Sequence, residues 1–169
     1  FFLLKEEWRT NLRVGFGYDA HKLIPGKGMV LGGIFIESEF SIEAYSDGDV
    51  IIHALIDSLL GAAALGDIGG LFPSEDPKNE EVSSRLLLNE VVSLLSSKHY
   101  EIINVDITLI AEEPKIREQI DLIIECISKD LKIEKEYVSC KATTTDGLGF
   151  EGTKKGIACQ AVSLIKKSL

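Results

Sequence analysis

Alternating apolar and polar positions predict the strands of this chain, and apolar residues at helical spacing predict its helices. The clearest alternation runs from Ile102 to Ile110 and indicates a strand with one buried face. Other strands are expected at residues 11–18, 29–36, 137–145 and 156–165, with a short helix as the alternative for the last of these. Helices are expected at residues 47–64 and 80–98 and from Pro114 to about residue 130. The apolar face predicted for the second helix holds Leu86, Leu87, Val91, Leu94 and Leu95.

Turn-forming and capping residues divide these elements. Pro25-Gly26-Lys27-Gly28 predicts the turn between the first two strands, and residues 37–45 are expected to form a loop. Ser46 or Asp47 is the expected N-cap of the helix that follows, and Gly66 is its expected C′ residue. Helices and strands then alternate, so we expect an α/β (α+β) fold with a mixed four- to five-stranded sheet and helices packed on one face. Residues 1–169 suit a single domain, with residues 1–11 as an N-terminal lead-in.

The composition narrows the class of function. Hydrophobic residues make up 45% of the chain, and no apolar run is long enough to span a bilayer, so we expect a soluble protein. The net charge of −9 argues against binding to nucleic acid or to an anionic membrane. Cys126, Cys140 and Cys159 follow no ligand or disulfide spacing, and we expect them to be buried small side chains in a reducing compartment.

Two stretches carry residue types that bind metals. Asp19 and His21 stand two residues apart at the end of the first predicted strand, so an extended backbone points both side chains to one face. His53 falls in the opening turns of the helix predicted after Ser46-Asp47-Gly48-Asp49. One Asp and two His can hold zinc and leave a fourth position for water or a substrate oxygen. On spacing alone, packed or solvated side chains remain the alternative interpretation.

Three further stretches suit polar ligands. Residues 67–77 form a long loop rich in Gly, Pro and Asp, which is more often functional than idle. Residues 111–115 join a strand to a helix, where backbone amides can receive a polar ligand. In residues 141–150, the hydroxyls of three consecutive threonines can cradle phosphate, and Asp146 can hold a magnesium ion that bridges phosphoryl oxygens.

Two glycine patterns look like dinucleotide-binding fingerprints but lack the required context. Residues 15–20 match G-x-G-x-x-A, and residues 147–152 match G-x-G-x-x-G. The fingerprint must open a helix inside a βαβ unit. Pro25-Gly26 interrupts any helix after the first pattern, and too little chain follows the second. The sequence also holds no P-loop and no G-x-S-x-G nucleophile elbow.

Taken in order, the motifs resemble one family over nearly the whole chain from Arg13 onward. They are Gly17-Tyr18-Asp19-Ala20-His21, Ser46-Asp47-Gly48-Asp49 with His53, residues 60–69, Phe72-Pro73, Pro114-Lys115 and residues 141–150. Together they resemble the 2-C-methyl-D-erythritol 2,4-cyclodiphosphate synthases. The resemblance implies a lyase of the non-mevalonate isoprenoid pathway that converts 4-diphosphocytidyl-2-C-methyl-D-erythritol 2-phosphate to the cyclic diphosphate and CMP. It also implies a homotrimer with active sites between subunits.

The resemblance assigns roles to individual residues. Asp19, His21 and His53 would hold one Zn²⁺ per subunit, and Asp146 would hold Mg²⁺ or Mn²⁺ with the substrate diphosphate. Tyr45 and Thr144 are the expected catalytic residues. The expected substrate contacts are Asp19, His21, Tyr45, Ser46, Asp67, Ile68, Gly69, Phe72, Pro73, Ser74, Glu75, Asp76, Ala111, Pro114, Lys115, Ile116, Arg117, Thr143, Thr144, Thr145, Asp146, Phe150 and Thr153. The pathway runs in the bacterial cytoplasm and in plastids (apicoplast or chloroplast stroma), and the missing initiator Met favours a plastid protein.

Four positions depart from the family pattern. Tyr45 stands where the family has a His that stabilises the transition state, and Asp146 stands in place of Glu. Ser74 replaces an Asp of the substrate loop, and Thr153 replaces an Arg that faces the central cavity of the trimer, where isoprenoid diphosphates have been proposed to bind. Two other functions therefore stay open. One is a zinc hydrolase of phosphate esters, and the other is a catalytically impaired homologue that binds isoprenoid diphosphates or partner enzymes.

Overall fold

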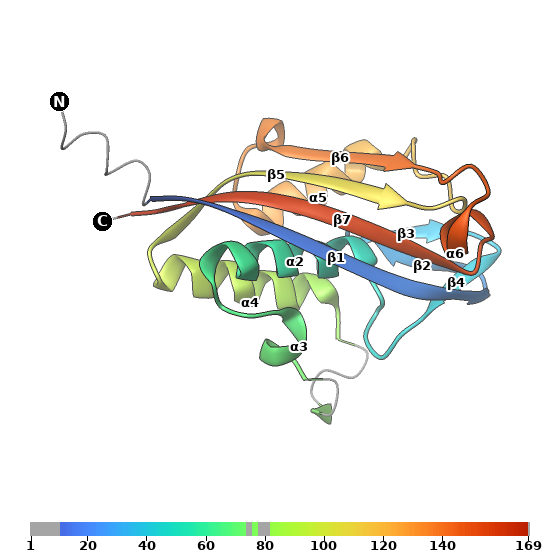
Figure 1. The fold of residues 1–169 in the computed structure, drawn as a ribbon, viewed down its shortest axis with the longest axis horizontal. Helices are drawn as coiled ribbons and strands as arrows, with labels where there is room; N and C mark the ends of the chain where they lie inside the picture. The colour runs from blue at the N-terminus through green and yellow to red at the C-terminus, as the bar shows by residue number, and fades with distance from the viewer. Residues whose placement is uncertain (1–10, 74–75, 78–81, 169) are drawn as a thin grey trace.

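The computed structural model describes residues 11–73, 76–77 and 82–168. Within this part, five strands form one mixed sheet in the order β4-β1-β7-β5-β6 (Figure 1). Their bounds are Leu12–Pro25 (β1), Phe40–Glu43 (β4), Tyr100–Ile110 (β5), Val138–Thr143 (β6) and Gly156–Lys167 (β7). β5 and β6 are parallel, and the other neighbours are antiparallel. A separate hairpin pairs β2 (Gly28–Leu31) with β3 (Ile34–Glu37). The predicted mixed sheet is confirmed.

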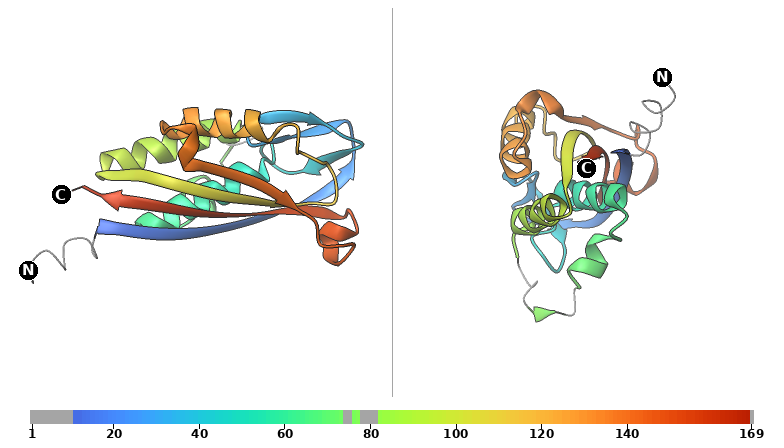
Figure 2. Two further views of the ribbon diagram at one scale, coloured as in Figure 1. Left: turned by 90° about the horizontal axis from the view of Figure 1, so that it is seen from above. Right: turned by 90° about the vertical axis from the view of Figure 1, so that its left-hand side faces the viewer.

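The long helices cover one face of the sheet (Figure 2). α2 (Val50–Ala63) packs on β1 and β7, α5 (Ile120–Leu131) packs on β6, and α4 (Ser84–Ser97) packs on α2 and α5. The short helices α3 (Ile68–Leu71), η2 (Lys135–Tyr137) and α6 (Gly149–Gly152) lie in connections. The core fills the space between sheet and helices and includes Leu55, Leu59, Leu88, Ile107 and Ile127. None of the helices described is long and apolar enough to cross a membrane.

β1 carries different residues on its two faces, because side chains alternate along a strand. The face toward α2 carries Gly15, Gly17, Asp19 and His21, and the opposite face carries Val14, Phe16 and Tyr18, which are exposed. Strand and helix approach closely at the glycines, since a Cβ atom on Gly17 would lie 1.9 Å from the carbonyl oxygen of Ala54. The glycines of the rejected dinucleotide pattern therefore serve strand–helix packing.

Several strand boundaries differ from the prediction. β1 continues past Tyr18 to Pro25, so Asp19 and His21 lie within the strand, where both are paired with β7. The turn after Pro25 is found as predicted, but the strand expected at residues 29–36 is broken at Gly32-Gly33, where both residues have positive φ. Residues 40–43, expected in a loop, form the edge strand β4. In β5 a register shift between Ile102 and Asn104 places Ile102 on the buried face.

The helices begin later than predicted. α2 is capped by Asp49 rather than Ser46 or Asp47. It ends at Ala63, and the C-cap residue Ala64 takes the left-handed conformation expected of Gly66. The helix expected from residue 80 begins at Ser84, residues 80–81 lying outside the described part. Leu86 is exposed, because the helix phase places Leu87 and Leu88 toward the core. α5 begins at Ile120 instead of Pro114, since residues 111–119 form a loop.

Asp49 connects the β2–β3 hairpin to the start of α2. Its carboxylate accepts the backbone N–H groups of Gly32 at 2.8 Å, Gly33 at 2.6 Å and Ile52 at 3.1 Å. Burial raises the pKa of Asp49 to about 6, although these three N–H groups act in the opposite direction. The contacts hold the first turn of α2, which carries His53, against the hairpin.

Candidate functional site

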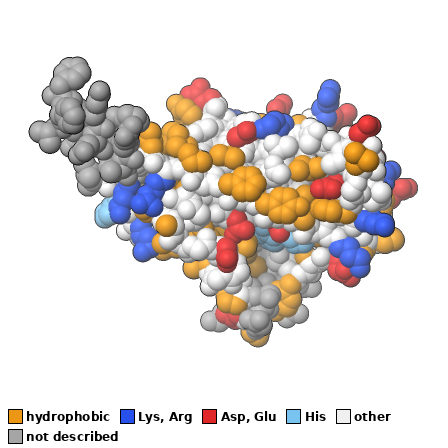
Figure 3. All heavy atoms as spheres, viewed as in Figure 1, with side chains coloured by type: hydrophobic (Ala, Val, Ile, Leu, Met, Phe, Trp, Pro, Cys, Tyr) orange, Lys and Arg blue, Asp and Glu red, His pale blue; other side chains and the backbone are white. Residues whose placement is uncertain are grey.

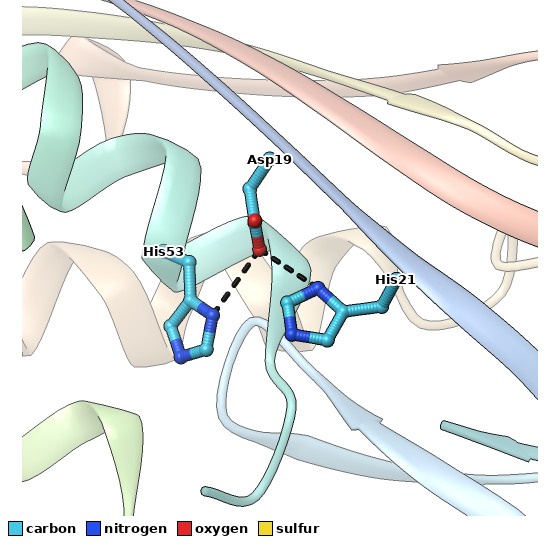
Figure 4. A group of neighbouring side chains, drawn as sticks. All are labelled: Asp19, His21 and His53. Atoms are coloured by element: carbon cyan, nitrogen blue, oxygen red, sulfur yellow. Dashed lines mark hydrogen bonds and ion pairs between the residues drawn. The ribbon is translucent and has the colours of Figure 1, made fainter. Parts of the chain in front are cut away.

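Asp19, His21 and His53 come together where β1 meets α2 (Figure 4). Nδ1 of His53 lies 3.1 Å from Oδ2 of Asp19, and Nδ1 of His21 lies 2.9 Å from the same oxygen. One potential ligand atom from each residue lies within 4.8 Å of the others. All three side chains are at least three-quarters buried. The three residues that the sequence placed on a strand and a helix thus share one small volume.

This group suits a cation because its polar atoms face one another. Nδ1 of His21 is buried and makes no aligned hydrogen bond, despite its short distance to Asp19. Although burial opposes ionisation, the two histidines hold the pKa of Asp19 well below its usual range, so this carboxylate is ionised. Two imidazole nitrogens and one carboxylate oxygen are a donor set that zinc accepts in sites with an open fourth position. The residues present therefore fit a zinc ion.

A cavity of about 370 Å³ opens beside the Asp19, His21 and His53 group. Besides Asp19 and His21, the predicted substrate residues that line it are Tyr45, Ser46, Ile68, Gly69, Phe72 and Pro73. Asp57 of α2 helps to place this wall, because its carboxylate accepts the N–H of Ile68 at 2.7 Å. The Asp57 contact therefore fixes the start of α3 against the helix that carries His53.

A second cavity, of about 440 Å³, lies between the loop after β5 and the end of β6. The predicted substrate residues that line it are Ala111, Pro114, Lys115, Ile116, Arg117, Thr143 and Thr144. The two linings share no residue. Within one chain, the residues predicted to bind a single substrate are thus divided between two cavities.

Two described residues of the predicted substrate loop, Asp67 and Asp76, lie outside both linings. Asp67 caps α3, where its side chain accepts the N–H of Gly70 at 2.8 Å. Asp76 lines a neighbouring cavity together with Phe72 and Pro73. Ser74 and Glu75 lie outside the described residues.

The turn around α6 holds the remaining predicted residues, Thr145, Asp146, Phe150 and Thr153. The hydroxyl of Thr145 donates to the carbonyl oxygen of Leu148, and that of Thr153 donates to Gly149 at 2.7 Å. Both hydroxyls thus form hydrogen bonds within the turn. Asp146 is exposed, and its backbone has the left-handed conformation, with a φ of 56°.

Ser84 is a polar residue of this site that sequence analysis missed. It is fully buried at the start of α4, and its Oγ lies 2.8 Å from Nε2 of His53. Asp47, predicted only as a possible N-cap, contacts Ser84 with both carboxylate oxygens. The available signal was a serine pair before an apolar helix, and helix capping alone accounts for such a pair.

Comparisons with known proteins agree with one another. The sequence profile of the YgbB family matches residues 12–166. The chain is 48% identical to the 2-C-methyl-D-erythritol 2,4-cyclodiphosphate synthase of Moorella thermoacetica, over 91% of this chain and 94% of that protein. It resembles the solved structure of IspF from Plasmodium falciparum in its CDP complex (TM-score 0.83, 38% identity, 94% of this chain and 98% of that one).

A longer solved protein contains the same fold. The bifunctional IspDF from Campylobacter jejuni matches with a TM-score of 0.89 and 35% identity, over 93% of this chain. This chain spans 42% of that bifunctional protein. The Moorella and Campylobacter relatives are bacterial proteins.

Proposed function

The chain belongs to the YgbB family, and from this premise we propose that it acts as a 2-C-methyl-D-erythritol 2,4-cyclodiphosphate synthase. It converts 4-diphosphocytidyl-2-C-methyl-D-erythritol 2-phosphate to the 2,4-cyclodiphosphate and CMP, a phosphorus–oxygen lyase reaction of isoprenoid precursor synthesis. The observation that carries the proposal is the Asp19, His21 and His53 group beside a cavity lined by predicted substrate residues.

The two cavities suit different parts of this substrate. The cavity beside the candidate metal group would take the erythritol part, against Ile68, Gly69, Phe72 and Pro73. The second cavity would take the cytidine part, where Lys115 and Arg117 supply positive charge in a chain whose net charge is −9. Residues 143–146, at the end of β6, would hold the diphosphate between them.

Two cation sites follow from these placements. Asp19, His21 and His53 would hold zinc, and the exposed carboxylate of Asp146 would hold magnesium or manganese with the diphosphate. When bound, such cations act as Lewis acids that neutralise phosphate charge and polarise phosphorus–oxygen bonds. The chain's own part is to supply the ligands, of which His53 is buried on α2.

The chemistry needs two anionic groups held in line. An oxygen of the 2-phosphate attacks the β-phosphorus, the bond from that phosphorus to the bridging oxygen breaks, and CMP leaves with the electron pair. Because both partners are negatively charged, positioning and charge neutralisation supply most of the rate. Thr144 would donate a hydrogen bond to the phosphate oxygens. The Tyr45 phenol, on the wall of the first cavity, would donate a hydrogen bond where the family has a His.

We further propose a homotrimer in which the two kinds of cavity meet between neighbouring subunits. The division of the predicted substrate residues between two cavities supports this arrangement. So does the outer face of the sheet, where apolar side chains cluster along β1 and β7 (Figure 3). Phe16 is 60% exposed there, beside Val162 of the neighbouring strand. Apolar patches of this kind mark association surfaces.

The assembly is tested by placing a charge in this patch. Phe16→Glu should shift the sedimentation velocity from trimer to monomer and abolish CMP release, while each chain still binds zinc through residues on the opposite face of β1. A trimeric Phe16→Glu variant would count against the outer sheet face as the contact surface. The bacterial relatives support the bacterial cytoplasm as the compartment.

The test of the reaction is CMP release from the diphosphocytidyl substrate before and after zinc removal, with the co-product followed by phosphorus NMR. Zinc-dependent CMP together with a cyclic diphosphate is the expected result. Free inorganic phosphate would indicate a hydrolase, and the absence of CMP from a folded, zinc-loaded trimer would indicate a binding protein.

A further inference from the structure

We propose that Asp47 and Ser84 are positioning residues that orient the His53 ring and turn its Nδ1 toward the candidate metal site. The inference rests on the zinc centre of the proposed function and deepens it, since neither residue belongs to the ligand set. It brings α4, which starts at Ser84, into a site otherwise built from β1 and α2.

The Asp47 carboxylate acts only as an acceptor. Its Oδ1 accepts a hydrogen bond from the hydroxyl of Ser84. The same oxygen accepts the backbone N–H of Asp49 at 3.2 Å. Its Oδ2 accepts the backbone N–H of Ser84 at 2.9 Å. All three partners are donors, so Asp47 holds Ser84 by two bonds and fixes the direction of its hydroxyl.

Ser84 has one hydroxyl proton, and it uses that proton to donate a hydrogen bond to Asp47. The Oγ of Ser84 can then serve only as an acceptor for Nε2 of His53, 2.8 Å away. Ser46 Oγ lies 3.4 Å from the same nitrogen, which makes it the weaker of the two partners. Nε2 of His53 therefore carries a proton.

A neutral ring with a proton on Nε2 presents a lone pair at Nδ1. Nδ1 lies 3.1 Å from Oδ2 of Asp19, so two lone pairs would repel each other unless a cation lies between them or Nδ1 is protonated as well. Histidines that bind metals commonly donate their other N–H to an outer partner, which orients the ring. The hydrogen-bonded series Asp47–Ser84–His53 therefore prepares Nδ1 as a metal ligand.

The surrounding packing keeps Ser84 in place. Ser84 is fully buried, and the next residue, Arg85, forms a two-pronged ion pair with Asp130 of α5, with its Nε 2.7 Å from the carboxylate. Because Asp130 is itself buried, this pair holds the start of α4 against α5. The orientation of His53 is thus tied to the packing of two other helices.

The first experiment measures zinc affinity of the full-length protein by competition with a chromogenic chelator. Ser84→Ala should bind zinc about 10- to 100-fold more weakly than the wild type, the range found for lost outer partners of metal-ligating histidines. Ser84→Thr, which keeps the hydroxyl, should recover affinity. Ser128→Ala is the matched control, because its buried hydroxyl donates to the carbonyl oxygen of Glu125 far from the site, and it should bind zinc like the wild type. Wild-type affinity in Ser84→Ala would overturn the inference.

The second experiment does not depend on the folding of any variant. Nitrogen NMR of the zinc-loaded wild type should show a one-bond proton coupling at Nε2 of His53 and none at Nδ1. A proton on Nδ1, or zinc on Nε2, would overturn the inference while leaving zinc binding and the proposed reaction intact. A wild type that binds no zinc would overturn both the metal centre of the proposed function and this role of Asp47 and Ser84.

Discussion

Replacing Gly17 by alanine should separate β1 from α2 and disturb the candidate metal centre. The new Cβ atom would lie 1.9 Å from the carbonyl oxygen of Ala54, whereas ordinary contact begins near 3.4 Å, so strand and helix must move apart by about 1.5 Å. The obstructing atoms belong to the backbone and cannot rotate away as a side chain could. Overpacking costs about 3 kcal/mol at the upper end of its usual range, and the stiffer unfolded chain offsets about 1 kcal/mol. The net loss of about 2 kcal/mol corresponds to about 4–8 °C in Tm for a chain of this size.

The same movement should weaken zinc binding, because the strand carries Asp19 and His21 while the helix carries His53. Metal sites tolerate distance errors of only about 0.2 Å, far less than the required movement. Calorimetry at one fixed protein concentration and chelator competition would measure the two effects. Gly61→Ala, the same substitution on the exposed side of α2, is the control: its Cβ meets only the carbonyl oxygen of Phe16, at 3.8 Å, and it should be as stable as the wild type or slightly more stable. If Gly17→Ala kept both the wild-type Tm and the wild-type zinc affinity, the close strand–helix contact would not have the role assigned to it.

Three further measurements probe the site and the core. His53→Ala should lose zinc and CMP release together but remain trimeric in sedimentation, since His53 is buried away from the outer sheet face; one zinc per subunit by metal analysis would contradict the ligand assignment. Tyr45→His should raise kcat for CMP release, because an imidazolium can carry the positive charge that a phenol lacks, and an unchanged kcat would show that the phenol is no impairment. Burial raises the pKa of Cys140 to about 11, so at pH 8.5 a disulfide reagent should leave this thiol unmodified in the folded protein. The chain unfolded in urea should react at once. Rapid labelling of Cys140 in the native protein would contradict its burial.

Local patterns were sufficient for much of the fold and for proposing the Asp19, His21 and His53 group, although spacing alone left packed or solvated side chains as the alternative. Alternation predicts β5. β5 and β6 are parallel, and parallel neighbours need a crossover connection, which is usually a helix. Asp19 and His21 could be grouped because a strand repeats every two residues, and His53 could be added because it starts an apolar helix. The three cysteines are buried, as their isolated positions indicated.

Features that depend on tertiary contacts could not be predicted from the sequence. Nothing near Ser84 indicates that its hydroxyl meets the ring of His53, 31 positions earlier, because only the packing of α4 on α2 brings them together. The break at Gly32-Gly33 depends on Asp49, which accepts both N–H groups from another element. The separation of the predicted substrate residues into two cavities is likewise a property of the folded surface and of no single segment.

The alternation of β1 constrains the length of this segment more strictly than its composition. Phe16 and Tyr18 point outward, and Gly17 and Asp19, the next residues in turn, point toward α2. Removing the one residue between Gly17 and Asp19 would reverse every side chain on one side of the deletion, so the Asp19 carboxylate would point away from α2. Substitutions can therefore adjust either face of the strand independently, whereas insertions and deletions would exchange the two. A designer who needs extra residues here should add them at the turn of residues 26–27, beyond the paired strand.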